Sequence, residues 1–373
     1  MTTVFVFVGR DPDSGRYFGP CMLICDSAVT DSLSRMSLCS PHNGMFHRRS
    51  RARGGTFVAS VVAAGVRTRV EWGTGSKRYT SREFMKKTAA RHIPDFLKPT
   101  LKRIYYFPVD VVGRWKARNG MIPPKSMIFI GDGDFEQAGR EFKKYFIELA
   151  NLQPNNRVLD VGCGIGRMAI PLTDYLSPEG EYWGFDIVKK GVAWCQNRIS
   201  PRFGNFHFLH SDVYNKHYNP KGKVQARDFR FPFNDETFDF IFLTSVFTHM
   251  LPSDMENYLS EISRVLKAEG KCLITFFLMN EESESLVRSG RSTLDFRFEM
   301  QDCLTVSEND PEAAIAYREE FVTKVFEKHG VRIVRPIHYG TWCKRERALT
   351  YQDLIIATKK GIPLRSECRA TEG

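Results

Sequence analysis

The chain has 373 residues, of which 42% are hydrophobic and 26% are charged, and its formal net charge is +11. This composition is typical of a soluble globular protein, and no apolar run reaches the roughly 18 residues that a membrane-spanning helix needs. No secretory signal opens the chain, and its nine cysteines show no paired CxxC spacing. We therefore expect reduced thiols and a cytoplasmic location rather than a disulfide framework.

The positive charge is confined to the amino-terminal third of the chain. Residues 1–130 carry a net charge of +14, whereas residues 131–373 carry −3. A protein that acts on nucleic acid is expected to line its cleft with Lys and Arg. The charge distribution therefore argues against a nucleic-acid substrate.

Residues 1–84 differ in composition from the rest of the chain. They contain 11 Arg and one Lys, whereas residues 85–373 contain 22 Arg and 20 Lys. Their apolar residues show no sustained period of 2 or 3.6, which indicates no regular element. We interpret them as a non-native extension, with the natural start at Met85. A disordered extension and an organelle-targeting segment are the alternatives.

Residues 85–130 form a basic segment in which Lys and Arg alternate with aromatic side chains. Such a pattern is typical of a peripheral contact with a membrane surface, for which residues 85–127 are the candidate. The alternative, which we favour, is an arm that packs on the following domain and turns its basic face to water. Pro108, Pro123 and Pro124 exclude one long helix.

Strand and helix patterns alternate from residue 131 to residue 360, and residues 361–373 are a tail. A helix with one apolar face is expected over 135–149, with Asp132 or Asp134 as its amino-terminal cap. The turn at 131–134 either borders a ligand pocket or only caps this helix. Later helices are expected at 192–200 and 313–330. Strands are expected at 157–161, 182–186, 205–213, 238–244, after a turn at Gly270, at 331–340 and at 351–359.

Three glycines join the first expected strand to its helix. Gly162, Gly164 and Gly166 allow a ligand to lie against bare backbone, where free N–H groups and the helix dipole favour electron-rich atoms. Asp160 adds an acceptor at the end of the strand. Arg167 occupies the place of the third glycine of a dinucleotide-binding turn, and the phosphate loop G-x-x-x-x-G-K-[ST] is absent.

Further features follow this turn in a fixed order. Asp186 ends the next strand twenty residues after Gly166, where a carboxylate can accept both hydroxyl hydrogens of a ribose. The stretches FPFNDETFD at 231–239 and RVLKAEGK at 264–271 come next. With the D-x-G-x-G-x-G turn, they resemble the motifs of class I S-adenosylmethionine-dependent methyltransferases of the small-molecule type. The resemblance covers about residues 131–360.

This resemblance implies an α/β fold, namely a Rossmann-like three-layer sandwich with a seven-stranded, mostly parallel sheet and an antiparallel last strand. It implies S-adenosyl-L-methionine as the cofactor. An acid in the place of Asp212 usually meets the adenine amino group in this family, and the next apolar side chain packs on the ring. The residues expected to hold the cofactor are Asp160, Gly162, Cys163, Gly164, Gly166, Asp186, Ile187, Asp212, Val213 and Thr244.

The segment after the fourth strand bears on the methyl acceptor. It reads LTSVFTHM at 243–250, and it lacks the [ND]-P-P-[YF] turn of enzymes that methylate nucleic-acid bases. His249 titrates near neutrality and is the candidate general base, with a packing or hydrogen-bonding role as the alternative. The insertion at 281–314 is the candidate lid. The candidates for acceptor contacts are Phe247, His338, Tyr339 and Trp342.

Two smaller points complete the site expected from the sequence. The cationic loop at 341–350 either binds an anionic group of the substrate or is a solvated hairpin tip. No cluster of His, Cys and carboxylate residues has metal-ligand spacing, so we expect no metal.

The leading hypothesis is an enzyme that transfers a methyl group to a small molecule or a glycan, at oxygen. A lipid or membrane-associated acceptor is the alternative, motivated by the basic segment at 85–127. A catalytically inactive nucleotide-binding scaffold is the non-enzyme alternative. The retained glycines and the three acids at 160, 186 and 212 argue against that scaffold. The sequence does not predict the oligomeric state.

Overall fold

The structure is a computed structural model that describes residues 2–8, 21–25, 57–63, 66–72, 106, 120–129 and 133–360, the first four ranges by their backbone alone. The chain divides into two compact units, Met1–Pro94 and Asp95–Gly373. No helix among the described residues is both long enough and apolar enough to cross a membrane.

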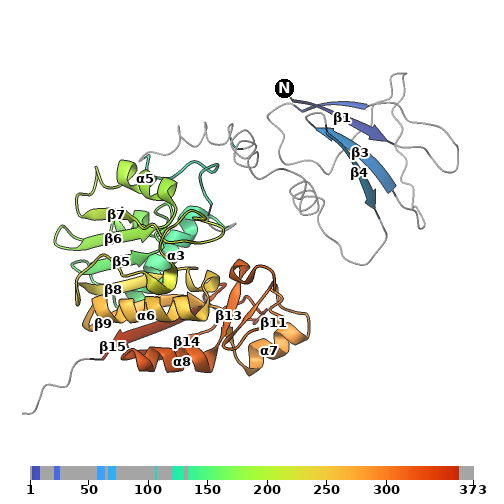
Figure 1. Cartoon of the computed structure of the whole chain (residues 1–373). Helices are drawn as coiled ribbons and strands as arrows, with labels where there is room; N and C mark the ends of the chain where they lie inside the picture. The colour runs from blue at the N-terminus through green and yellow to red at the C-terminus, as the bar shows by residue number, and fades with distance from the viewer. Residues whose placement is uncertain are drawn as a thin grey trace, which may run out of the picture. The chain divides into compact units, whose positions relative to one another are not determined.

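The first unit contains a four-stranded antiparallel sheet with the strand order β2-β1-β3-β4 (Figure 1). Its strands are β1 (Thr2–Val8), β2 (Cys21–Cys25), β3 (Phe57–Ala63) and β4 (Val66–Trp72). The sequence pattern indicated no regular element here. Only two residues separate β3 from β4, so this pairing is local in sequence and needs no long period of apolar residues. The interpretation of residues 1–84 as an extension stays a prediction.

The second unit is built on a seven-stranded sheet with the order β14-β15-β9-β8-β5-β6-β7 (Figure 1). From β9 to β7 all neighbouring strands are parallel, whereas β15 runs antiparallel to both β9 and β14. This confirms the predicted α/β fold and its antiparallel last strand. The strands are β5 (Arg157–Val161), β6 (Glu181–Asp186), β7 (Phe206–His210), β8 (Phe238–Leu243), β9 (Leu266–Phe276), β14 (Val331–His338) and β15 (Asp353–Lys359).

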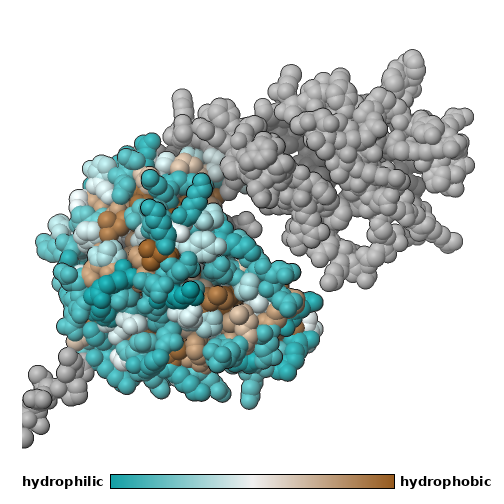
Figure 2. Space-filling model, in the orientation of Figure 1, coloured by the Kyte–Doolittle hydropathy of each residue, from teal (hydrophilic) through white to brown (hydrophobic). Residues whose placement is uncertain are grey.

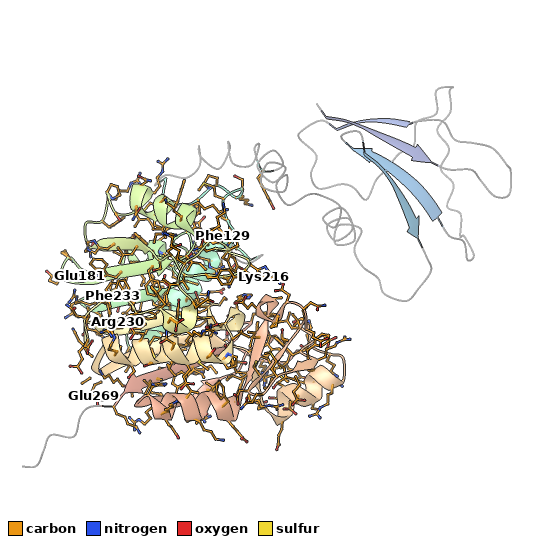
Figure 3. All side chains as sticks on the ribbon, in the orientation of Figure 1. Phe129, Glu181, Lys216, Arg230, Phe233 and Glu269 are labelled. Atoms are coloured by element: carbon orange, nitrogen blue, oxygen red, sulfur yellow. The ribbon has the colours of Figure 1, made fainter. Side chains whose placement is uncertain are left out.

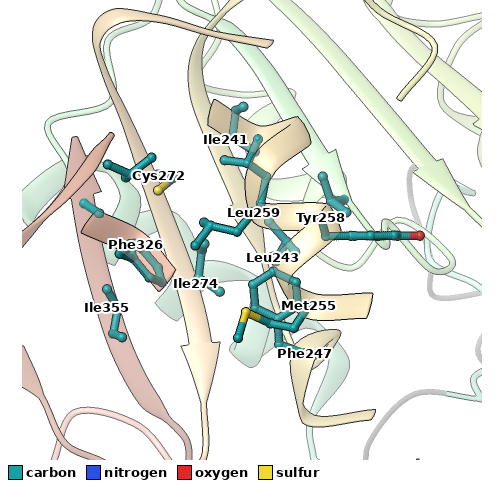
Figure 4. Close-up of a cluster of buried hydrophobic side chains, with 14 of the residues drawn as sticks. Ile241, Leu243, Phe247, Met255, Tyr258, Leu259, Cys272, Ile274, Phe326 and Ile355 are labelled. Atoms are coloured by element: carbon teal, nitrogen blue, oxygen red, sulfur yellow. The ribbon is translucent and has the colours of Figure 1, made fainter. Parts of the chain in front are cut away.

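Helices cover both faces of this sheet, which gives three layers. Helices α6 (Pro252–Val265) and α8 (Glu319–Lys328) pack on one face, and part of this core is drawn in Figure 4. The other face packs against α3 (Phe135–Glu148), α4 (Ala169–Leu172) and α5 (Lys189–Arg198).

The division into two cores follows from the alternation of side chains along the strands. On β8, Ile241 and Leu243 belong to the core under α6, and Phe240 and Phe242 belong to the core on the other side. Each is at most 1% exposed, and burial of one such side chain stabilises the fold by about 1.5–3 kcal/mol. Hydrophilic residues cover most of the visible surface of the described part of this unit (Figure 2).

The predicted cap of the first helix is confirmed. Asp134 precedes α3, and its Oδ1 accepts a hydrogen bond of 2.8 Å from the backbone N–H of Gln137. This satisfies one of the free donors in the first turn. The other candidate for the cap, Asp132, lies outside the described residues.

The insertion after β9 forms a second, smaller sheet with the order β10-β13-β12-β11. Its elements are β10 (Leu278–Met279), α7 (Glu281–Arg288), β11 (Phe298–Glu299), β12 (Cys303–Thr305), a 3-10 turn η3 (Pro311–Ala313) and β13 (Ile315–Arg318). The lid role of this segment stays a prediction.

Two expected boundaries are wrong. The helix predicted over 313–330 begins only at Glu319, because Ile315–Arg318 form β13. Both faces of β13 are buried, so its apolar run lacks the alternation that identifies a half-exposed strand. The turn predicted at Gly270 lies inside β9, where Glu269 has a φ of 61°.

Candidate functional site

The carboxyl ends of β5, β6 and β8 border one cavity of about 910 Å³. In the sheet, β5 lies between β6, the next strand in the chain, and β8, which comes later in the chain. This is the point at which the strand order reverses, where open α/β sheets bind their ligands. Figure 3 shows Phe129 and Lys216 near these strand ends, away from Glu181 at the start of β6.

The glycine turn after β5 needs glycine for two separate reasons. Gly162, Gly164 and Gly166 have φ values of 87°, 58° and 85°, in the left-handed region that side chains disfavour. A Cβ atom added to Gly162 would also meet Cγ2 of Val246 at 2.5 Å. The turn therefore places bare backbone at the floor of the cavity.

Asp186 lies at the end of β6 and is only 8% exposed. Its Oδ2 accepts a bond of 2.8 Å from the N–H of Gly164, and its Oδ1 accepts one of 2.6 Å from the N–H of Val188. Burial raises the pKa of this carboxyl, and the two backbone donors oppose that rise. A carboxylate oxygen can accept more than one hydrogen bond, so Asp186 can also receive hydroxyl hydrogens from a ligand.

Asp160 and Arg167 line the same cavity and are incompletely paired. Oδ2 of Asp160 accepts a bond of 2.5 Å from the hydroxyl of Tyr182. Its Oδ1 and Nε of Arg167 are buried and have no hydrogen-bond partner among the residues that the structure describes. Sequence reasoning gave Arg167 no role, and only the absence of the third fingerprint glycine drew attention to it.

Most of the predicted cofactor residues come together at this cavity. Gly164 and Gly166 shape its glycine turn, whereas Asp212 borders an adjoining cavity of about 600 Å³, which Ile187 and Tyr218 also line. The ligand roles of all ten stay predictions. Those that line the main cavity are Asp160, Gly162, Cys163, Asp186, Ile187, Val213 and Thr244.

His249 lines the same cavity, in the 3-10 turn η2 (Phe247–His249) after β8. Its Nδ1 is 2.9 Å from the backbone oxygen of Glu312. A carbonyl oxygen can only accept, so Nδ1 carries the proton and Nε2 keeps its lone pair. Burial lowers the pKa of this imidazole, against the opposing effect of the Glu312 carbonyl. The neutral ring can therefore accept a proton through Nε2.

The four residues predicted to contact the acceptor do not line the cavity. Phe247 is fully buried in the cluster drawn in Figure 4, and its ring centroid lies 5.4 Å from that of Phe276. Tyr339 donates its hydroxyl hydrogen to the Glu319 carboxylate. His338 is the last residue of β14. These three residues and Trp342 are thus not brought together at the cavity, and their contacts with an acceptor stay predictions.

The loop at 341–350 has exposed residues at 344 and 346–349 and buried residues at 342, 343 and 345, and both interpretations of it stay predictions. Trp342 is fully buried and donates from Nε1 to Asp353 over 2.8 Å. The Arg345 side chain is 5% exposed and pairs with Asp353 at 3.3 Å and Glu282 at 2.7 Å. Its charge is thus satisfied inside the protein.

Much of the cavity lining consists of residues that sequence reasoning missed. They come from separate segments, so no local pattern marks them. Gly133 is an exception, because the turn before α3 was one candidate border of the pocket. The missed residues include Phe129, Phe142, Met168, Tyr218, Asp254, Tyr258, Phe277, Leu294, Glu312 and Tyr351.

Two ion pairs join the walls at one side of the cavity. Asp310 lies 3.2 Å from Nζ of Lys216 and 3.0 Å from Nε2 of His217. Tyr218 beside the first partner and Glu312 beside Asp310 both line the cavity. We call the contacts of Asp310 with Lys216 and His217 the mouth pairs. In the part of the chain that the structure describes, no three His, Cys, Asp or Glu side chains are placed to hold a metal ion.

Residues 159–274 match the family model of the methyltransferase domain. Over 158 residues the chain is 29% identical to a sterol 24-C-methyltransferase of Schizosaccharomyces pombe. The aligned stretch makes up 42% of this chain and 37% of that protein. Over 128 residues it is 30% identical to a demethylmenaquinone methyltransferase of Geobacillus sp. Here the aligned stretch makes up 34% of this chain and 47% of that protein. The chain thus spans less than half the length of these two curated relatives.

A solved structure of a SAM-dependent methyltransferase from Aquifex aeolicus is also similar, with 20% identity and a TM-score of 0.36, over 61% of this chain and 99% of that one. The matched segment begins in β5, contains the glycine turn and Asp186, and ends in β9. The residues at the cavity fit the cofactor of the matched family, because Asp186 and the buried Oδ1 of Asp160 both have acceptor capacity to spare. Residues 159–274 therefore form a methyltransferase domain, whose cofactor is S-adenosylmethionine.

Proposed function

We propose that this protein is an enzyme that transfers a methyl group from S-adenosylmethionine to oxygen of a small-molecule acceptor. The observation that carries the proposal is one cavity that the glycine turn, Asp186 and His249 all line. When bound, S-adenosylmethionine supplies a methyl group on a positively charged sulfur, which an acceptor nucleophile attacks in line.

His249 would serve as the general base of this reaction. The bond from its Nδ1 to the Glu312 carbonyl orients the ring and leaves the Nε2 lone pair free. Because burial lowers the pKa of His249, the ring is neutral at physiological pH and ready to accept the hydroxyl proton of an acceptor.

We call the part of the cavity that Tyr258, Phe277, Leu294, Asp254 and Glu312 line the acceptor wall. Its side chains favour a molecule that has an apolar body and hydroxyl groups. Tyr258, Phe277 and Leu294 offer aromatic and aliphatic surface, and Asp254 and Glu312 offer carboxylate acceptors. Burial raises the pKa of both carboxyls. A glycan acceptor falls within this proposal, because sugars present hydroxyl groups together with apolar ring faces.

A lipid-like acceptor is the second candidate, and the similarity to proteins named sterol and demethylmenaquinone methyltransferases supports it. Its membrane contact would use residues 85–127, most of which lie outside the described residues. Removal of these residues should then abolish binding to vesicles. For either candidate we propose a cytoplasmic location, supported by five described cysteines that are buried and free.

Product identification tests the proposal. The full chain is incubated with methyl-labelled S-adenosylmethionine and panels of phenols, glycosides, quinols and sterols, and the products are identified by mass spectrometry. We expect a methyl ether that disappears with the His249→Gln variant. A product methylated at carbon would favour the lipid-like candidate. Failure of the protein to bind S-adenosylmethionine at all would overturn both.

A further inference from the structure

Exposed large hydrophobic side chains gather on two loops of the second unit. Seven such side chains are exposed among the described residues, and five of them belong to residues 213–224 or residues 341–351, which we call the rim loops. A single exposed apolar side chain is ordinary, whereas a concentration of them marks a surface that another molecule or a membrane covers. The five are Tyr214, Tyr218, Val224, Leu349 and Tyr351.

Both rim loops lie at the edge of the large sheet where its parallel strands end. The first loop follows β7 and the second follows β14, and these are the two outermost strands. Because β9 and β14 both pair antiparallel with β15, β14 runs in the same direction as β9 and the strands up to β7. Tyr218 of the first loop and Tyr351 of the second both line the cavity. The two loops therefore flank the cavity at one edge of the sheet.

Each rim loop also carries exposed cations that no acid neutralises. They are Lys221 and Lys223 on the first loop, and Lys344 and Arg347 on the second. None of the four has an ion pair among the described residues. Residues 213–224 include no acid, and residues 341–351 include one, Glu346.

This combination of side chains is complementary to the surface of an anionic bilayer. Tyrosine rings settle at the level of the lipid headgroups, with the apolar part of the ring buried and the hydroxyl in water. Lys and Arg near the surface are attracted to anionic lipids. A soluble polyanion would be bound by the cations alone and would leave the five apolar side chains without a partner.

We propose that the rim loops dock the protein on the surface of a lipid bilayer that contains anionic lipids, with the cavity turned toward the bilayer. The apolar side chains enter the headgroup region, and the four cations face the lipid phosphates and carboxylates. This inference rests on the proposed function in its lipid-like form, because an acceptor dissolved in the bilayer then reaches the cavity without crossing water. The contact adds to the one proposed for residues 85–127, and stable peripheral binding commonly takes two signals.

Binding of the full chain to vesicles tests the docking surface. Vesicles of phosphatidylcholine mixed with phosphatidylserine are compared with vesicles of phosphatidylcholine alone, and bound protein is separated by flotation. We expect the protein to bind the anionic vesicles more tightly, and this preference should shrink as salt is added. Each variant is first checked for unchanged affinity for S-adenosylmethionine by calorimetry, since none of the substituted residues lines either cavity.

The charge variant combines Lys223→Gln with Arg347→Gln and so removes one cation from each rim loop. One cation near an anionic surface contributes about 5-fold in affinity, so the affinity for anionic vesicles should fall about 25-fold. The matched control combines Lys324→Gln with Arg332→Gln, which removes the same charge from exposed residues of α8 and β14. This control should bind as the unaltered protein does.

Leu349→Ser and Val224→Ser test the apolar part of the contact, one on each rim loop. Each should lower the affinity for both kinds of vesicle about 3- to 10-fold, because the interface no longer buries an aliphatic side chain. Val334→Ser is the matched control, since Val334 is 41% exposed and lies on β14, outside the rim loops. It should bind both kinds of vesicle normally.

The outcomes distinguish this inference from the function on which it rests. The inference is overturned if the full chain binds neither kind of vesicle, or if the rim-loop variants bind as their controls do. It is also overturned if only the charge variant loses affinity and its affinity for heparin falls equally, which would assign the loops to a soluble polyanion. Turnover of phenols and glycosides in solution, without vesicles, tests the proposed function separately. Product formation without vesicle binding would leave that function intact, whereas vesicle binding without any methylated product would overturn the function instead.

Discussion

The part of the cavity that we propose to bind the cofactor, the cofactor wall, is made by chain segments that directly follow β5 and β6. Much of its chemistry is backbone, namely the glycine turn and the N–H groups that fix Asp186. The acceptor wall, in contrast, collects side chains from α6, η3, the segments beside the smaller sheet and residues 350–352. A turn that presents backbone depends on a few consecutive residues. A wall made of side chains depends on the whole tertiary structure, which makes it free to differ between proteins that share a cofactor.

The largest expected effect separates the two walls by turnover. His249→Gln keeps a donor toward the Glu312 carbonyl but removes the basic nitrogen, so turnover should fall about 100-fold or more while cofactor affinity stays unchanged. Steady-state kinetics and calorimetry measure the two quantities. In the unaltered enzyme, turnover should decline only below about pH 6.5, because burial lowers the pKa of His249.

His207→Gln is the control for this prediction, since His207 lies on β7 and lines neither cavity. Normal turnover of His249→Gln would remove the proposed base. Loss of cofactor affinity would show that the two walls are not independent.

The next effect tests the cofactor wall. Asp186→Ala removes the acceptor expected for the ribose, so the affinity for S-adenosylmethionine should weaken by about 1–3 kcal/mol. It also frees the N–H groups of Gly164 and Val188, which Asp186 now binds. Calorimetry provides the measurement, and an unchanged dissociation constant would contradict the role. Exposed Asp228→Ala is a suitable control, because it does not border the cavity.

A third prediction concerns the stability of the glycine turn. Gly162→Ala places a Cβ 2.5 Å from Cγ2 of Val246 and strains a positive φ, so we expect a loss of about 1–3 kcal/mol in unfolding free energy. Adding Val246→Ala should recover only the part due to the clash. Denaturant titration of both single variants and the double variant measures this coupling. If the losses in unfolding free energy of the two single variants simply add up in the double variant, the contact between residues 162 and 246 is not the cause of the loss.

The smallest expected effect concerns the mouth pairs. Asp310→Asn removes the partner of Lys216 and His217, whose side chains are 51% and 39% exposed. Exposed pairs contribute about 0–1 kcal/mol, so the acceptor KM should change only a few-fold and less at high salt. Cofactor affinity should stay constant. Glu308→Gln is the control, because it removes a negative charge from an exposed residue nearby. An equal change in the acceptor KM of this variant would show that the effect comes from net charge and not from the mouth pairs.

Sequence reasoning therefore succeeded where the deciding interactions are local. The bounds of β5 and the role of Asp134 as a cap both depend on adjacent residues. Phe247 was expected near the acceptor but does not line the cavity, because its direction depends on how η2 packs against Phe276. The burial of Trp342 and Arg345 depends on Asp353, which reaches them only because β15 pairs beside β14. The sequence contains no local signal for these long-range contacts.

The position of β15 has a consequence for synthesis on the ribosome. This last strand lies between β9 and β14, so both strands lack a sheet partner on that side until residues 353–359 have left the ribosome. An open strand edge is a template for pairing with another chain. The nascent protein thus passes through a stage in which its sheet is split, and a chain that stops short of β15 should aggregate rather than fold.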